Sequence, residues 1–216
     1  MAKYLFIGAH CDEEICFAGT MAKLSEQGNH VQFCAMSWCG REDLKDECLA
    51  SSKILGVHLW INNFSVRGFK DEAKNIANYF YSLQDYDYIF THSPYDKHPD
   101  HRTIGEESRR VFKGNLVTYL APWNGNDDPN YFVEISPSQM QKKIDSVRCY
   151  KSQAYRKYMD PEFIRAQAIF NGIKAGVRYA EGFTLVKGID FVQICTEFSN
   201  HTLRNVAQPL QGGIRY

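Results

Sequence analysis

Two short segments combine imidazole and carboxylate side chains directly after apolar runs. They are residues 9–14 (AHCDEE) and residues 98–101 (HPDH). Imidazole nitrogen and carboxylate oxygen are the ligands of catalytic zinc sites, which hold the metal with three side chains and leave a further position to water. Together the two segments predict one metal site.

The residue types also suggest roles in hydrolysis. His10, His101 and one carboxylate from residues 12–14 would supply three ligands. A carboxylate that is not a ligand can take a proton from the water, whose pKa a metal lowers from about 16 toward 7. Asp12 suits this role of general base. His98, three residues before His101, can protonate the leaving group or hydrogen-bond the oxyanion.

Each segment alone has a structural interpretation. Asp100 can orient one of the imidazole rings, or it can cap a helix that begins near Thr103. Asp12 can likewise cap a helix from Glu14 onward. The occurrence of both segments at the ends of separate predicted strands in one small chain favours the metal site.

Strand and helix signals alternate along the first 120 residues. Apolar runs predict strands at 3–9, 31–37, 57–61, 86–91 and 116–120, and helical spacing predicts helices at 14–27, 44–55, 71–84 and 103–112. This alternation is typical of βαβ units, so we expect a single α/β domain with a Rossmann-like, mostly parallel sheet and helices on both faces. Both segments would then lie at carboxyl ends of strands, where open α/β sheets bind ligands.

The pattern changes after residue 121. A turn-rich loop at 122–130 is expected to be either a surface connection or a rim over the site. Further elements are predicted as a strand at 131–135, helices at 137–150 and 161–176, and a return to the sheet at 180–186. We expect one domain over residues 1–216, with its core at about 3–187 and a loose tail at about 208–216.

Composition narrows the class of protein. Lys plus Arg and Asp plus Glu both number 25, so the charge balance gives no reason to expect nucleic acid as a partner. The start lacks the apolar core of a signal peptide, and no stretch approaches the roughly 20 apolar residues of a membrane span. Seven cysteines without a CxxC pair indicate reduced thiols. We predict a cytoplasmic protein without a transmembrane segment, and leave a homo-oligomer open.

The two segments resemble the motifs of a known family. Residues 7–14, continuing as FAGT at 17–20, are similar to the AHPDDE signature and following GGT of the LmbE/PIG-L-like de-N-acetylases, zinc hydrolases that remove N-acyl groups from amino sugars. Residues 91–101 resemble the second motif of that family. Weaker similarity at Glu47, at 150–153 and at 179–183 extends the resemblance from about residue 3 to about 187.

The resemblance implies zinc, or another divalent metal, on His10, Glu13 and His101. It implies Asp12 as general base and His98 as the acid or oxyanion group.

Two departures from the family pattern concern the first segment. Cys11 replaces the usual proline, and Glu13 replaces the usual aspartate ligand. The extra methylene of Glu13 moves its carboxylate by about one C–C bond, whereas metal distances hold within about 0.2 Å. Either the backbone compensates for this length or the site is altered. Glu14 matches the glutamate of the family and is expected to be structural, at the amino end of a helix.

Four residues are candidates for substrate binding: Arg41, Trp123, Asn130 and Glu181. Trp123 could stack on the apolar face of a sugar ring. For Glu181 the alternative, which we favour slightly, is a strand-edge glutamate held by backbone amides.

We therefore expect a hydrolase that removes the N-acetyl group of a small amino sugar or sugar conjugate by metal-activated water. Two alternatives stay open. One is an amidase acting on a sugar-linked conjugate, and the other is a catalytically impaired sugar-binding module in which Glu13 has spoiled the metal site. A nucleotide-binding Rossmann domain is disfavoured, because residues 7–14 lack a GxGxxG and place acids where phosphates need amides.

Overall fold

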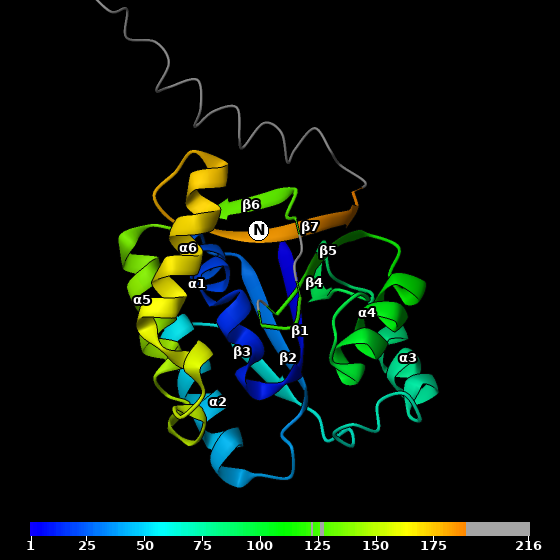
Figure 1. Cartoon of the computed structure of the whole chain (residues 1–216). Helices are drawn as coiled ribbons and strands as arrows, with labels where there is room; N and C mark the ends of the chain where they lie inside the picture. Colours follow the sequence, from blue (N-terminus) through cyan, green and yellow to red (C-terminus); the bar gives the residue numbers. More distant parts are fainter. Residues whose placement is uncertain (122, 126–127, 189–216) are drawn as a thin grey trace, which may run out of the picture.

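In the described part of the chain, seven strands form one sheet in the order β3-β2-β1-β4-β5-β7-β6, shown in Figure 1. The structure is a computed structural model, and it describes residues 1–121, 123–125 and 128–188. The strands are β1 (Lys3–His10), β2 (His30–Ser37), β3 (His58–Ile61), β4 (Tyr88–His92), β5 (Asn115–Tyr119), β6 (Tyr131–Glu134) and β7 (Ala180–Lys187). Strands β1 to β5 pair in parallel, and β7 pairs antiparallel with both β5 and β6. The predicted α/β fold with a mostly parallel sheet is confirmed.

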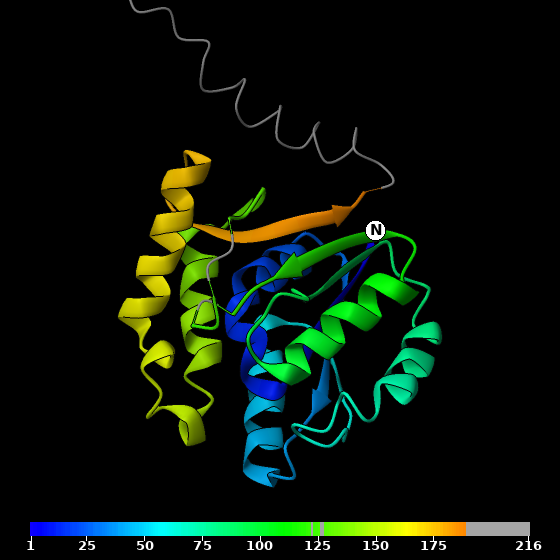
Figure 2. The same ribbon diagram turned by 45° about the vertical axis from the view of Figure 1, so that its right-hand side comes forward.

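Helices cover both faces of the sheet. They are α1 (Ala18–Glu26), α2 (Glu42–Leu55), α3 (Ala73–Tyr81), α4 (Pro99–Val111), α5 (Pro137–Val147) and α6 (Pro161–Ala175), with the short 3-10 helices η1 (Cys11–Cys16), η2 (Lys151–Gln153) and η3 (Lys157–Met159). Figures 1 and 2 show α1, α2, α5 and α6 on one side and α3 and α4 on the other.

Alternate residues of β1 belong to two different cores. Phe6 packs with residues of α1 and α2, whereas Leu5 and Ile7 pack with residues of α3 and α4, and all three side chains are fully buried. Burial of each such side chain contributes about 1.5–3 kcal/mol. Strand β1 is therefore fixed from both faces, and its last residue, His10, is held at the carboxyl edge of the sheet.

Two helices begin elsewhere than predicted, and both changes affect the motif segments. The helix predicted at 14–27 is divided, because Phe17 has non-helical dihedrals (φ −143°, ψ 10°) between η1 and α1. The helix predicted at 103–112 begins four residues earlier, at Pro99, with His98 as its N-cap. Proline suits the first helical position, because its fixed φ is that of a helix and its missing N–H would have no partner there. The HPDH segment is thus the first turn of α4.

Other expectations concern membrane spans, the cysteines and the chain end. None of the described helices is long and apolar enough to cross a membrane. The cysteines of the described part are free thiols, while Cys195 and the predicted tail at 208–216 lie outside it.

Glu181 of β7 connects three elements beneath the sheet edge. Its side chain is 2% exposed. It accepts hydrogen bonds from the amides of Gly19 (3.0 Å) and Thr20 (2.7 Å) in the first turn of α1, and it forms an ion pair with Lys143 of α5. The carboxylate thereby satisfies amides that have no partner within the helix.

We expect Glu181→Gln to lower the free energy of unfolding by about 3 kcal/mol, because it leaves Lys143 buried without its counter-charge. Urea denaturation followed by circular dichroism measures the change. The matched control is Glu134→Gln at the exposed last position of β6, where we expect a change within about 0.5 kcal/mol. Equal stability of both variants would show that the buried pair does not hold these elements together.

Candidate metal centre

Glu13 lies on η1 in the middle of three imidazole rings. Its Oε1 is 2.9 Å from His10 Nδ1 and also contacts His101 Nε2, and its Oε2 is 2.6 Å from His92 Nε2. The side chain is nearly fully buried. Burial raises the pKa of Glu13, but its electrostatic interactions with His101, His92 and His10 outweigh this effect and hold the pKa well below the usual range. The cluster therefore contains an ionised carboxylate that requires positive charge beside it.

The Glu13 side chain is long enough to accept a backbone hydrogen bond at the start of its own helix, η1. His10 precedes η1 in an extended conformation, and its backbone N–H donates to Glu13 Oε2 at 3.1 Å. A glutamate at the third position of a helix makes this bond in a capping box. The extra methylene thus lets one carboxylate reach both its own helix end and the rings of two other elements.

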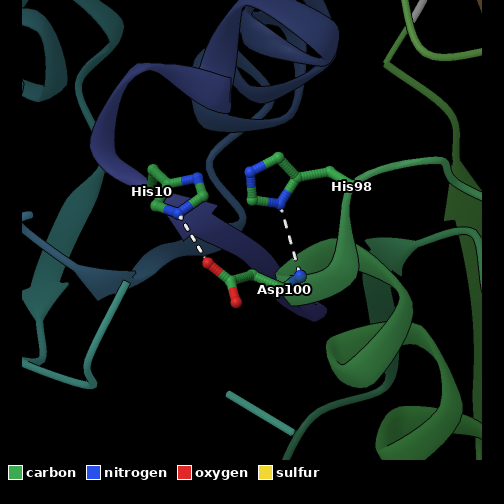
Figure 3. Close-up of side chains that lie close together, drawn as sticks. All are labelled: His10, His98 and Asp100. Carbon is green, nitrogen blue, oxygen red and sulfur yellow. Dashed lines mark hydrogen bonds and ion pairs between the residues drawn. The ribbon is translucent and has the colours of Figure 1, made fainter. Parts of the chain in front are cut away.

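The first turn of α4 brings the second segment to the same place. His98 Nδ1 accepts a hydrogen bond from the amide of Asp100 at 3.3 Å. Asp100 Oδ2 lies 3.3 Å from His10 Nε2, as Figure 3 shows, and it accepts the amide of Arg67 at 2.7 Å. Asp100 therefore links α4, the end of β1 and the loop after β3.

A different carboxylate holds His101. His101 Nδ1 lies 3.0 Å from Asp96 Oδ2, and Asp96 Oδ1 accepts from the amide of His98 and from Asn124 Nδ2, both at 2.8 Å. Such a contact on one ring nitrogen fixes the orientation of the other. Here the other nitrogen, Nε2, faces Glu13.

Among the residues that the structure describes, three groups of side chains have donor atoms within 4.8 Å of one another, as in a metal site. They are His10 with Glu13 and His101, His10 with His98 and Asp100, and His92 with Asp96 and His101. The first group contains the three ligands that the family resemblance implies. Burial lowers the pKa of His101, but Glu13 and Asp96 raise it to about 9. A divalent cation supplies the positive charge that this proton supplies beside Glu13, so the donor set fits a metal.

A cavity of about 510 Å³ opens over this cluster. His10, Asp12, Glu13, His98 and His101 all line it. Five of the six residues predicted for metal binding and proton transfer therefore face one space, and Asp100 lies behind them with its carboxylate 1% exposed. The volume falls in the range of pockets that bind small organic molecules.

The predicted substrate-binding residues divide into two pairs. Arg41 and Trp123 line the cavity. Asn130 does not, and its side chain accepts the amide of Leu185 on β7 at 2.8 Å. Glu181 does not either, because its carboxylate is directed to the amides of α1, as the structural interpretation expects. The structure places only the first pair at the site.

Sequence reasoning gave no role to His92, which ends β4. Its ring is fully buried and stacks on that of His101, with centroids 4.0 Å apart. Its Nε2 also lies 2.9 Å from the hydroxyl of Tyr119, which donates to the carbonyl of Ile7. Burial and the neighbouring His101 lower the pKa of His92 to about 4, so the ring is neutral. The available signal was an imidazole at the end of a predicted strand, but its proximity to Glu13 required knowing that β4 lies beside β1.

The α/β fold places a buried cluster of imidazoles and carboxylates, a candidate metal centre, at the carboxyl edge of the sheet. Residues 5–112 match the family model of PIG-L, the GlcNAc-PI de-N-acetylases. The chain belongs to this family.

One deacetylase is similar to part of this chain. The diacetylchitobiose deacetylase of Thermococcus kodakarensis is 32% identical in an alignment of 120 positions that covers 47% of this chain and 44% of that protein. Less than half of that relative is therefore matched.

Two solved structures show the fold. A conserved protein of Thermus thermophilus superimposes with a TM-score of 0.77 at 21% identity, covering 89% of this chain and 98% of that one. The N,N'-diacetylchitobiose deacetylase of Pyrococcus horikoshii, complexed with its inhibitor MPG, gives 0.70 at 24% identity, covering 88% and 85%.

We expect Glu13→Asp to weaken zinc binding about tenfold, which corresponds to about 1.4 kcal/mol. The shorter side chain cannot reach His92 and the His10 amide from a backbone set for glutamate. Competition with a chelating dye measures the affinity, and Glu106→Asp on the exposed face of α4 is the matched control.

A double-mutant cycle of Glu13→Asp with His92→Phe tests whether the contact with His92 positions the Glu13 carboxylate for zinc. If His92 positions Glu13, the second substitution weakens binding in the native background and has little further effect beside Glu13→Asp. Tighter binding by Glu13→Asp would instead show a strained replacement of the usual aspartate. An unchanged affinity would remove Glu13 from the ligand set.

Proposed function

We propose that this protein is a metal-dependent hydrolase that removes the N-acetyl group of an amino sugar or sugar conjugate. The observation that carries the proposal is the convergence of both motif segments on one cavity at the carboxyl ends of β1 and β4. Membership of the de-N-acetylase family and the deacetylase relatives support the reaction and the substrate class.

We assign the metal to His10, Glu13 and His101, with zinc as the expected ion and another divalent ion as the alternative. Two imidazoles and one carboxylate are a ligand set of catalytic zinc sites. When bound there, zinc lowers the pKa of a water molecule and polarises the amide carbonyl. The fully buried group of His92, Asp96 and His101 is a poorer candidate, because only His101 of the three lines the cavity.

Asp12 is assigned as the general base. It lines the cavity beside Glu13, and burial followed by the charge of Glu13 raises its pKa above the usual range. Asp12 is not among the proposed ligands, and its carboxylate lines the cavity in which the attacking water is expected. Asp12 therefore takes the proton of the attacking water.

His98 is assigned to the oxyanion or the leaving group. Burial, with the charges of His101 and His10, lowers its pKa, so the ring is neutral near pH 7. Because Nδ1 accepts the amide of Asp100, the proton of the neutral ring resides on Nε2. That N–H can donate to the oxyanion that forms on the amide carbonyl. Asp100 acts as a positioning residue for both His98 and His10.

Asp12→Asn should retain the metal and lose about 10²-fold or more in kcat, the scale of a removed general base. His101→Ala should instead lose the metal. Metal analysis of purified protein and release of acetate from N-acetylglucosamine and N,N'-diacetylchitobiose are the measurements. Asp46→Asn, at an exposed position of α2, is the matched control and should alter neither the metal content nor the release of acetate.

Two outcomes would contradict these assignments. If Asp12→Asn sheds zinc while Glu13→Gln keeps it, ligand and base must be exchanged. If the native protein shows no saturable zinc binding and releases no acetate, the impaired sugar-binding module becomes the better description.

A further inference from the structure

Three arginines line the cavity beside the metal centre. They are Arg41, Arg67 and Arg156, whereas the carboxylates among the described lining residues are Asp12 and Glu13, both within the catalytic cluster. The chain as a whole has a formal net charge of zero. The positive charge around this cavity therefore does not follow from a basic composition and requires a local explanation.

Arg67 is tied directly to the reaction centre. Its backbone has φ of 64°, in the left-handed region that non-glycine residues rarely adopt. Its amide donates to Asp100 Oδ2, the atom that also faces His10 Nε2. Strained backbone of this kind persists where the surroundings hold it, often at ligand sites.

The side chain of Arg67 is available to a ligand. Within the described part of the chain, its guanidinium has neither a hydrogen-bond partner nor an ion-pair partner, and the residue is exposed. Arg41 differs, because its guanidinium forms a bidentate pair with Asp43. Arg67 is therefore the arginine of this set whose donors are unused.

Arg156 lies beside two aromatic residues that line the same cavity, Trp123 and Tyr158. We call this pair the aromatic wall. Its guanidinium donates to the hydroxyl of Tyr158 at 2.5 Å and lies over the Tyr155 and Tyr158 rings, 5.7 and 5.6 Å from their centroids. Tyr158 in turn stacks on Trp123 with centroids 3.8 Å apart and an interplanar angle of 11°. The wall thus offers apolar surface for a sugar ring and a cation beside it.

We propose that Arg67, with Arg156, binds an anionic substituent, a phosphate or a carboxylate, carried by the N-acylated sugar. This inference rests on the proposed deacetylase function and adds the substrate class. A guanidinium presents parallel N–H donors that match the oxygens of phosphate or carboxylate. The cavity of about 510 Å³ has room for a sugar and a charged group together.

The test compares matched substrates of the metal-loaded protein. N-acetylglucosamine 1-phosphate and N-acetylmuramic acid carry a phosphate and a carboxylate, and the methyl glycoside of N-acetylglucosamine is the neutral reference. We expect kcat/KM for at least one anionic substrate to exceed the neutral one about tenfold or more, the scale of a hydrogen bond to a charged group. The better of the two anionic substrates identifies the anion.

Substitution of Arg67 isolates its part. Arg67→Met should raise KM for the preferred anionic substrate about tenfold, change the neutral one less than about twofold and leave metal content unchanged. Arg67→Lys keeps the positive charge but lacks the paired N–H donors of the guanidinium, so its KM for the anionic substrate should lie between those of the native protein and Arg67→Met. Arg110→Met on α4, outside the cavity lining, is the matched control and should alter neither substrate.

Equal kcat/KM for anionic and neutral substrates would overturn the anion site and leave the deacetylase function intact. An equal loss of kcat/KM for the anionic and the neutral substrate in Arg67→Met would also overturn the anion site and leave the deacetylase function intact. If no substrate releases acetate, the proposed function fails, and calorimetric titration with N-acetylglucosamine 1-phosphate decides the anion site by itself. Binding weakened about tenfold in Arg67→Met would support it, and unchanged binding, as expected for phosphate held by the metal alone, would overturn it.

Discussion

The buried carboxylate of Glu13 is the interaction on which the site depends. Its side chain is nearly fully buried, so its negative charge requires positive or hydrogen-bonding groups beside it. His10, His92 and His101 reach it from the end of β1, the end of β4 and the first turn of α4. These three elements can meet only if their relative positions are fixed, and the electrostatic requirement of one residue therefore constrains the arrangement of the sheet edge.

The sheet meets that requirement through register and packing. Strands β1 and β4 pair in parallel with Phe6 opposite Phe90, so His10 and His92 leave the sheet at the same edge. Cores on both faces hold β1, because Phe6 packs on one side and Leu5 and Ile7 pack on the other. The loops that follow the strands at this edge then add the cavity lining, which is the usual division between a rigid scaffold and variable recognition elements in open α/β folds.

Much of the fold and the two motif segments could be predicted from the sequence. Apolar periodicity is a local property, so the alternating strands and helices were identified with boundaries shifted by a few residues. The mixture of imidazoles and carboxylates in each segment indicated a metal site, and His10, Asp12, Glu13, His98 and His101 do face one cavity. Glu13 was also recognised as the departure from the family pattern, because residue type and spacing are visible in the chain itself.

Only the tertiary structure decided which distant side chains join these segments. Strand order places His92 beside Glu13, 79 residues away in the chain. Loop packing brings Arg67 and Arg156 to the cavity, whereas Glu181 is directed to the amides of α1. Residue types and local spacing are written in the sequence, but these contacts join positions far apart in the chain, and they form only when the strands pair and the helices pack on both faces of the sheet.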